Sequence, residues 1–237
     1  MGGVRPPSMK TPFRVGILVF DKITLLDAIG PYEAFASLPG ASVILIARRK
    51  RAVVAGGGIT LLPQTDLSRC PKLDVLLIPG GTGVNALLLD EEVLAFVRRR
   101  ARTARYVTSV CTGSLILGAA GLLQGRRAAC HWLSLPMLAA FGAKPSSRRI
   151  EQDGKFITAG GVTSGIDFGL SLAAKIAGVA VAKKIQLMIQ YDPQPPFRAG
   201  TPAQAGKKLT AQIIHRTRFP MAVRAAIVAK AAGRLAK

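Results

Sequence analysis

Short runs of β-branched and other apolar residues alternate along the chain with segments whose apolar positions recur at helical spacing. This alternation is typical of βα units on a largely parallel sheet, so the pattern predicts an α/β fold. Residues 150–158, with Asp153-Gly154, predict a hairpin, and residues 52–62, broken by three glycines, predict a hairpin or a strand with a tight turn. The apolar runs predict strands over residues 13–20, 42–47, 73–78, 106–110 and 126–130.

Helices are predicted between these strands. Gly30-Pro31 interrupts the apolar pattern of residues 24–38, which predicts a short turn and then a helix that begins at Pro31. Asp90 is expected to cap a helix over 91–102, because acids come first in that segment and arginines last. Further helices are predicted over residues 133–141 and 164–190, the latter broken near Gly178.

The chain is expected to have three parts. Residues 1–12 form a flexible leader, and residues 13–200 form one domain that ends where prolines cluster after Asp192. Residues 201–237 form a basic extension. Its alanine-rich segment from Ala203 is expected to be helical and to pack on the domain or on a partner subunit.

Composition narrows the class of protein. Of the 237 residues, 49% are hydrophobic and 19% charged, which predicts a soluble globular protein. Three cysteines without a CxxC motif indicate neither a disulfide framework nor a zinc site, and favour a reducing, cytoplasmic compartment. We expect no secretory signal and no membrane span, since the longest apolar segment, 166–182, carries Asp167 and Lys175.

The net charge of +21 would attract polyanions, and nine basic residues follow Phe197. No aromatic residues are interleaved with the basic ones in a way that indicates base stacking. We therefore expect nonspecific binding of nucleic acid at low salt, and no dedicated nucleic-acid role.

Cys111 is the candidate nucleophile. It lies where the predicted strand 106–110 turns into an apolar helix, and small residues, Ser109 and Gly113, flank it. A thiol at a helix N-terminus meets unpaired backbone N–H groups and the helix dipole, both of which favour the thiolate. The alternative is that Cys111 is a small buried apolar residue.

Other groups could complete such a site. The N–H groups of Thr112 and of the Gly80-Gly81 turn are candidates for stabilising negative charge at the carboxyl ends of parallel strands. The proton carrier is either His131, which could instead be structural, or Asp27, which could instead cap a turn before Gly30. Burial among apolar neighbours would raise the pKa of Asp27.

Several segments in order along residues 13–200 resemble the ThiJ/PfpI superfamily, which has the class I glutamine amidotransferase-like fold. Within it, the motifs are most similar to those of the isonitrile hydratases. The segments that carry the resemblance are Leu26-Asp27 with Gly30-Pro31, Ile78-Pro79-Gly80-Gly81-Thr82-Gly83, Val110-Cys111-Thr112-Gly113-Ser114, His131-Trp132 and Gly160-Gly161-Val162-Thr163-Ser164-Gly165-Ile166-Asp167.

The resemblance implies a flavodoxin-like three-layer sandwich with a mostly parallel sheet and a nucleophile-elbow cysteine. It also implies a homodimer without metal or organic cofactor. Its expected substrate is a small isonitrile or a related electrophile, hydrated to an N-substituted formamide through a thioimidate. By motif, Cys111 is the nucleophile, Asp27 the general acid and base, and Thr112 an essential contributor. The expected substrate and oxyanion pocket consists of Gly80, Gly81, His131 and Val162.

Other functions are also compatible with the superfamily. One is a ligand-sensing regulator, although too few residues follow Pro202 for two helix-turn-helix units. Another is a glyoxal-handling or redox stress protein with a reactive Cys111. Amide hydrolysis is disfavoured because Thr112, and not histidine, follows Cys111.

Overall fold

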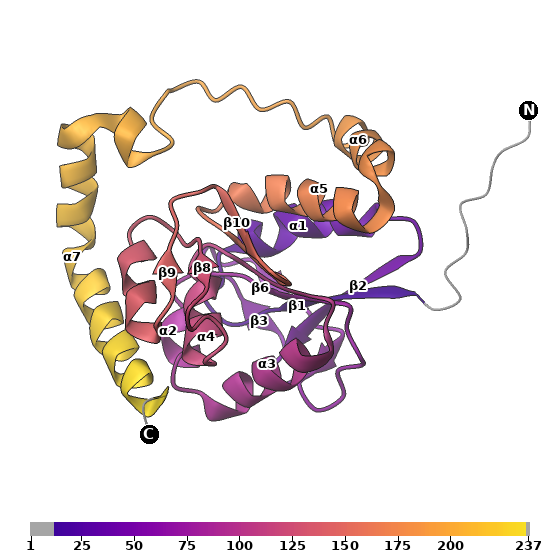
Figure 1. Cartoon of the computed structure of the whole chain (residues 1–237), viewed down its shortest axis with the longest axis horizontal. Helices are drawn as coiled ribbons and strands as arrows, with labels where there is room; N and C mark the ends of the chain where they lie inside the picture. Colours follow the sequence, from indigo (N-terminus) through magenta and orange to yellow (C-terminus); the bar gives the residue numbers. More distant parts are fainter. Residues whose placement is uncertain (1–11, 236–237) are drawn as a thin grey trace, which may run out of the picture.

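A seven-stranded sheet lies at the centre of the computed structural model, which describes residues 12–235 (Figure 1). The strand order is β10-β11-β7-β6-β1-β2-β5, and only the β10–β11 pair is antiparallel. The strands of this sheet are β1 (Phe13–Leu18), β2 (Ala41–Ala47), β5 (Thr65–Asp66), β6 (Val75–Ile78), β7 (Tyr106–Val110), β10 (Ile150–Asp153) and β11 (Phe156–Ala159).

Helices cover both faces of the sheet, which gives three layers (Figure 1). On one face, α1 (Leu25–Ala36) packs along α5 (Ser164–Ala177), and α6 (Val179–Met188) follows α5. The other face carries α2 (Val84–Leu87), α3 (Glu91–Thr103) and α4 (Gly113–Ala119). This arrangement confirms the predicted flavodoxin-like α/β sandwich.

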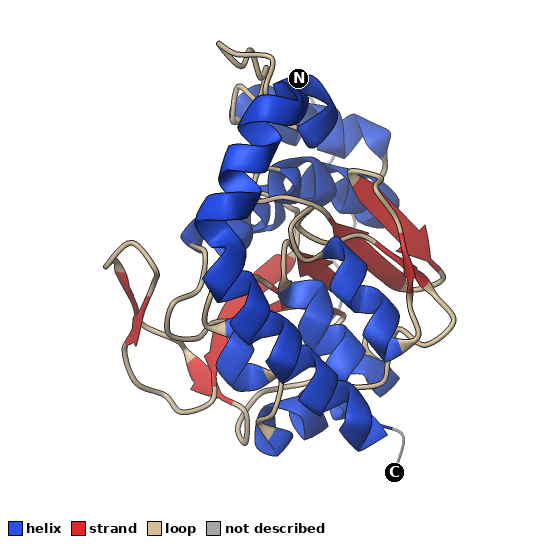
Figure 2. Cartoon of the chain, turned by 90° about the vertical axis from the view of Figure 1, so that its left-hand side faces the viewer, coloured by secondary structure: helices blue, strands red, loops and turns tan. Residues whose placement is uncertain are grey.

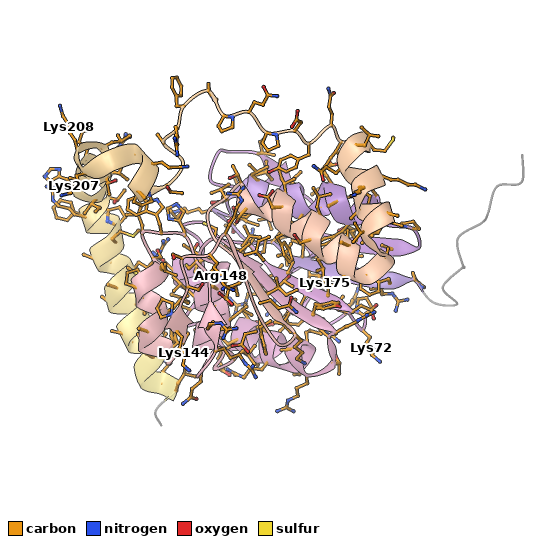
Figure 3. All side chains as sticks on the ribbon, turned by 45° about the horizontal axis from the view of Figure 1, so that its top comes forward. Lys72, Lys144, Arg148, Lys175, Lys207 and Lys208 are labelled. Atoms are coloured by element: carbon orange, nitrogen blue, oxygen red, sulfur yellow. The ribbon has the colours of Figure 1, made fainter. Side chains whose placement is uncertain are left out.

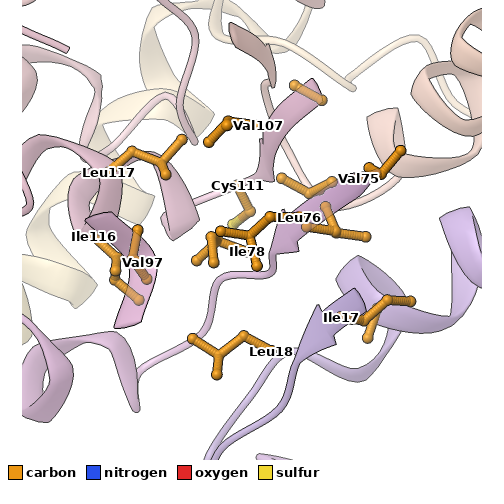
Figure 4. Close-up of a cluster of buried hydrophobic side chains, with 14 of the residues drawn as sticks. Ile17, Leu18, Val75, Leu76, Ile78, Val97, Val107, Cys111, Ile116 and Leu117 are labelled. Carbon is orange, nitrogen blue, oxygen red and sulfur yellow. The ribbon is translucent and has the colours of Figure 1, made fainter. Parts of the chain in front are cut away.

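Most of the predicted elements are present. The β6 residues are all fully buried, as their continuous apolar run predicts, and they pack among other core side chains in Figure 4. Asp90 caps α3 as predicted, because its carboxylate accepts hydrogen bonds from the N–H groups of Glu92 and Val93 at 3.1 and 3.2 Å. The hairpin predicted over 52–62 is formed by β3 (Val53–Val54) and β4 (Thr60–Leu61).

The predicted start of the first helix at Pro31 is wrong, because α1 begins at Leu25 and continues through Pro31. A proline inside a helix costs about 3 kcal/mol. Close packing against α5 offsets that cost. A Cβ added at Gly165 would lie only 3.1 Å from Pro31 Cδ, so the proline ring fills the space between the two helices.

The segment 126–130, predicted as a strand of the sheet, is only the short strand β8 (Arg127–Ala128), paired with β9 (Lys144–Pro145) outside the main sheet. Side chains take up the N–H groups that a ladder would use. Asp153 accepts from Arg127 at 3.0 Å, and Thr158 Oγ1 accepts from the Ala129 N–H at 2.7 Å. The helix predicted over 133–141 is a 3₁₀ helix, η1 (Leu135–Phe141).

The C-terminal segment forms α7 (Pro202–Leu235), which has a non-helical break at Gly206. An extended connection crosses from α6 to α7, and α7 packs against η1 and α4 (Figures 1 and 2). Arg224, Val228 and Ala231 form its buried face. The leader predicted over 1–12 lies outside the described residues, except for its last residue.

Positive charge is spread over several elements. In Figure 3 the labelled basic side chains come from separate elements that include β9, α5 and α7. Several acidic residues form salt bridges with exposed arginines, as in the pairs Arg51–Asp21 at 2.8 Å and Arg127–Glu151 at 3.0 Å. No helix within residues 12–235 has the length and apolar character needed to cross a bilayer.

Candidate active site

Cys111 occupies the corner between β7 and α4. Its φ is 58°, in the left-handed region that residues with a side chain seldom adopt. Hydrogen bonds hold the corner, since the Cys111 N–H donates to the carbonyls of Gly160 at 2.8 Å and Ala159 at 3.1 Å. The side chain is 5% exposed and lies among apolar side chains at the ends of β6 and β7 (Figure 4). Backbone strain of this kind is concentrated at functional sites.

The close approach of α4 to β6 depends on Gly113, because a Cβ at this position would lie 2.0 Å from the carbonyl oxygen of Ile78. We expect Gly113→Ala to lower the free energy of unfolding by about 2 kcal/mol or more, since either the corner or the end of β6 must move. Thermal or urea unfolding measures this loss.

Gly57→Ala is the matched control for Gly113→Ala. A Cβ at Gly57 meets no atom within 4 Å, and Gly57 does not have positive φ. Its effect on unfolding is expected to be neutral or slightly stabilising. Equal stability of the two variants would contradict the steric role of Gly113.

Asp27 lies in the first turn of α1 and is fully buried. Its Oδ2 accepts a hydrogen bond from the Gly80 N–H at 2.9 Å, whereas Oδ1 has no hydrogen-bond partner within residues 12–235. Burial raises the pKa of Asp27 to about 7, against the opposing effects of the Gly80 hydrogen bond and the neighbouring Cys111 side chain. Near neutral pH the carboxyl group can therefore both give and accept a proton.

Burial also raises the pKa of the Cys111 thiol well above its ordinary value, and the charges of Asp27 and Cys130 add to this rise. The Thr112 N–H at the start of α4 lowers the pKa, as the position at a helix N-terminus predicts, but burial outweighs it. The helix N-terminus thus favours the thiolate as predicted, but it does not determine the net direction of the shift. The thiol needs a base within reach to become a nucleophile, and Asp27 is the neighbouring group that can serve.

The glycines after β6 bring the other predicted groups to the corner. A Cβ at Gly80 would lie 2.5 Å from the Thr112 nitrogen and 2.9 Å from Asp27 Oδ2. The Gly81 N–H donates to Thr112 Oγ1 at 3.0 Å, and the Thr112 hydroxyl donates to the Gly81 carbonyl at 3.3 Å. The structure thus brings Asp27, Gly80 and Gly81 together with Thr112, which directly follows Cys111.

The other two predicted pocket residues lie farther along the chain. His131 is half-buried and lines a cavity of about 340 Å³ together with Trp132 and the start of α7. Burial and the charge of Arg224 lower the pKa of His131, which favours the neutral imidazole. Val162 lies in the turn between β11 and α5, where its carbonyl accepts from the Gly165 N–H at 3.4 Å.

Sequence reasoning missed Arg224, which is 5% exposed. Its guanidinium donates to Asn85 Oδ1 at 2.9 Å, to Ser134 Oγ at 3.0 Å and to the Gly81 carbonyl at 3.4 Å. Asn85 also lines a cavity of about 830 Å³ that includes none of the predicted site residues. The available signal was the spacing of Arg224, Val228 and Ala231, which places an arginine on the apolar face of a helix.

A metal site is not formed by side chains of the described chain, since no group of three or more histidine, cysteine, aspartate or glutamate residues within 12–235 could hold an ion. The three cysteines are free and buried.

Comparison with known proteins places the chain in a family. The model of the DJ-1/PfpI family matches residues 13–175. Isonitrile hydratase from Pseudomonas putida is 44% identical over 222 residues, which cover 94% of this chain and 97% of that enzyme. The HTH-type transcriptional regulator GbdR of Pseudomonas aeruginosa is 30% identical over 79% of this chain, which spans about half of the regulator, 53%.

Solved structures agree with this placement. A ThiJ/PfpI family protein from Pseudomonas syringae superposes with a TM-score of 0.89 at 39% identity, covering 96% of this chain and 97% of that one. Drosophila melanogaster DJ-1beta, at 19% identity, shares the fold with a TM-score of 0.70 over 77% of this chain and 100% of its own. The chain belongs to the DJ-1/PfpI family.

Proposed function

We propose that this chain is an isonitrile hydratase, a hydro-lyase that adds water to R–N≡C and releases an N-substituted formamide. The observation that carries the proposal is the buried pair of Cys111 and Asp27, in a chain 44% identical to the Pseudomonas putida enzyme over nearly its whole length. A carboxyl group with a pKa of about 7 beside a nucleophile is suited to moving a proton twice in one catalytic cycle.

The first half of the proposed reaction forms a covalent intermediate. Asp27 takes the proton of the Cys111 thiol, and the thiolate sulfur bonds to the isonitrile carbon. Negative charge develops on that carbon, which accepts the proton from Asp27. The product is a thioimidate, S–CH=N–R, and Asp27 is again a carboxylate.

The second half restores the enzyme. Asp27 takes a proton from water, whose oxygen bonds to the thioimidate carbon, and gives that proton to the nitrogen. Asp27 then takes the proton of the new hydroxyl group as the carbon–sulfur bond breaks, returns it to the sulfur, and HC(=O)–NH–R leaves. One carboxyl group serves in both halves, so the proposed cycle requires no histidine.

The remaining groups orient these steps. The Thr112 N–H interacts with the Cys111 sulfur and stabilises its negative charge. The Gly81 N–H is engaged by Thr112 Oγ1, so in this proposal Gly81 holds Thr112 in place. Gly80 holds Asp27. His131 and Val162 are proposed to border the organic group of the substrate.

The test is direct. Purified protein is incubated with a set of alkyl, cycloalkyl and aryl isonitriles, and formamide is followed by proton NMR. We expect enzyme-dependent formamide from at least one of them. Absence of turnover across a dozen varied isonitriles, with the protein folded and its thiol titratable, would overturn the proposal.

A second candidate function is ligand sensing in gene regulation, which the likeness to GbdR favours. It requires sequence-specific DNA binding at physiological salt, since a chain of net charge +21 binds any DNA when salt is low. A glyoxal-handling or redox role would instead show as turnover of methylglyoxal.

We further propose that the enzyme is a cytoplasmic homodimer. Large apolar side chains of α6 and α7 are exposed in the single chain, among them Leu187, Met188 and Phe219. Burial of such side chains against a second copy would remove apolar surface from water. Sedimentation or light scattering at micromolar concentration measures the mass of the assembly.

A further inference from the structure

Arg224 is a buried cation that has only neutral partners. Its three hydrogen bonds go to an amide oxygen, a hydroxyl and a backbone carbonyl, at 2.9, 3.0 and 3.4 Å. No carboxylate of the described chain forms a salt bridge with it. The arginines that do pair with acids are partly exposed, with side chains 35% to 75% accessible.

This distribution is energetically unusual. Moving a guanidinium out of water costs several kcal/mol unless an opposite charge compensates it. Here the acidic residues that form salt bridges do so with partly exposed arginines, where ion pairs contribute little. The buried Arg224 has no acidic partner within the described residues. The positive charge is therefore available to a negative group that forms during the reaction.

The groups beside Arg224 belong to the site. Burial raises the pKa of Cys130 to about 12 and lowers that of His131, and the charge of Arg224 acts to lower both pKa values. Negative charge on Cys111 acts in turn to raise the pKa of Arg224. The Gly81 carbonyl accepts from both Arg224 Nη2 at 3.4 Å and the Thr112 hydroxyl at 3.3 Å. Arg224 and Thr112, the residue after Cys111, thus share the Gly81 carbonyl as an acceptor.

We propose that Arg224 is a positioning residue of the Cys111 site, which holds the Gly81 carbonyl against Thr112 and places a buried positive charge next to the corner that carries Cys111. Its catalytic consequence rests on the proposed isonitrile hydration. Around Cys111, the charges of Asp27 from α1 and of Cys130 oppose the thiolate, and His131 is neutral. Burial lowers the pKa of Arg224 from α7, and negative charge on Cys130 and Cys111 raises it, so the guanidinium lies within electrostatic reach of both sulfurs.

The comparisons differ in how far they extend into α7. The family model ends at residue 175, and DJ-1beta covers 77% of the chain. The Pseudomonas putida isonitrile hydratase covers 94%, so the unaligned residues are too few to contain all of α7. At least part of α7 is therefore aligned with that enzyme, although α7 lies outside the residues that the family model matches.

The experiment measures the reactivity of the Cys111 thiol without any isonitrile. Full-length protein is alkylated with iodoacetamide from pH 6 to pH 10, and modification of the Cys111 peptide is followed by mass spectrometry. The variants are Arg224→Met, which removes the charge and fills the space, and Arg224→Lys, which keeps the charge. Arg234→Gln is the matched control, since Arg234 also ties α7 to the domain, through the Leu89 carbonyl at 3.0 Å.

We expect Arg224→Met to alkylate Cys111 about tenfold more slowly at pH 7.5, with its profile moved upward by about one pH unit. Arg224→Lys should stay close to the parent profile, and Arg234→Gln should match it. Methionine removes an uncompensated buried charge but leaves the acceptors on Asn85, Ser134 and Gly81 without their donor, so the folded state of Arg224→Met is checked directly. Its melting temperature is measured alongside.

Two results would overturn the inference. One is an unchanged alkylation profile in folded Arg224→Met, which would make the arginine dispensable for the thiol. The other is loss of folding in both Arg224 variants, which would assign Arg224 to stability alone. Because alkylation needs no isonitrile, either result is separate from success or failure of the hydration assay.

Discussion

Cys111→Ala is expected to lower kcat/KM for isonitrile hydration by about 10⁴-fold or more, because the proposed cycle has no other group that can bond to the isonitrile carbon. The variant should fold, since alanine replaces a small buried side chain and the β7–α4 corner is held by the backbone N–H at this position. Initial rates of formamide release at isonitrile concentrations well below KM give kcat/KM, and circular dichroism checks the fold.

Cys70→Ala is the control for this experiment. Cys70 is also a buried free cysteine, and it lies away from the corner, next to Arg100. Its removal is expected to change kcat/KM by less than about twofold. If Cys111→Ala kept activity within tenfold of the parent, covalent catalysis by Cys111 would have to be abandoned.

Asp27→Asn is expected to lower kcat/KM by about 10²- to 10⁴-fold, since it removes the proton carrier and keeps the thiol. The amide can still accept the Gly80 hydrogen bond that Asp27 Oδ2 accepts at 2.9 Å, so the geometry is preserved. The parent enzyme should gain activity as pH rises through about 7, where Asp27 becomes the carboxylate that accepts the thiol proton. A pH profile for Asp27→Asn with the same inflection near 7 would contradict this assignment.

The same carboxyl group makes stability depend on pH. Its pKa is about 7 in the folded protein and 3.8 for the free side chain, so the folded state holds more protons between these values. The free energy of unfolding should therefore fall as pH rises from about 4 to about 7, and level off above it. Asp27→Asn lacks this titration, so its melting temperature should rise relative to that of the parent between about pH 4 and about pH 7. Parallel curves for the two proteins would contradict the raised pKa.

Much of the fold follows from local pattern. Buried parallel strands such as β6 and β7 are short apolar runs, and the cap at Asp90 uses bonds within one turn, so neighbouring residues contain the information. The path of α1 through Pro31 does not follow from local pattern, because its stability depends on glycines of α5 that are distant in sequence. At Pro31, tertiary packing outweighs the low helix propensity of proline.

The site divides in the same way. Cys111 and Thr112 follow from a local strand-to-helix corner, and Asp27 stands out as an acid among apolar residues. The protonation of the corner does not follow, since burial by many distant segments decides the pKa of the thiol. Arg224 depends on contacts between α7 and residues near Gly81, which only the folded chain brings together.

The left-handed backbone at Cys111 restricts which nucleophiles this corner could use in the course of evolution. At a φ of 58°, a β-branched side chain clashes with its own backbone, so threonine is excluded although its hydroxyl serves other enzymes. Cysteine and serine, which are unbranched at Cβ, both fit. Aspartate and histidine are also unbranched at Cβ and are tolerated at positive φ. A change of nucleophile at this position is therefore confined to side chains without a β-branch, and wider change must come from the residues around it.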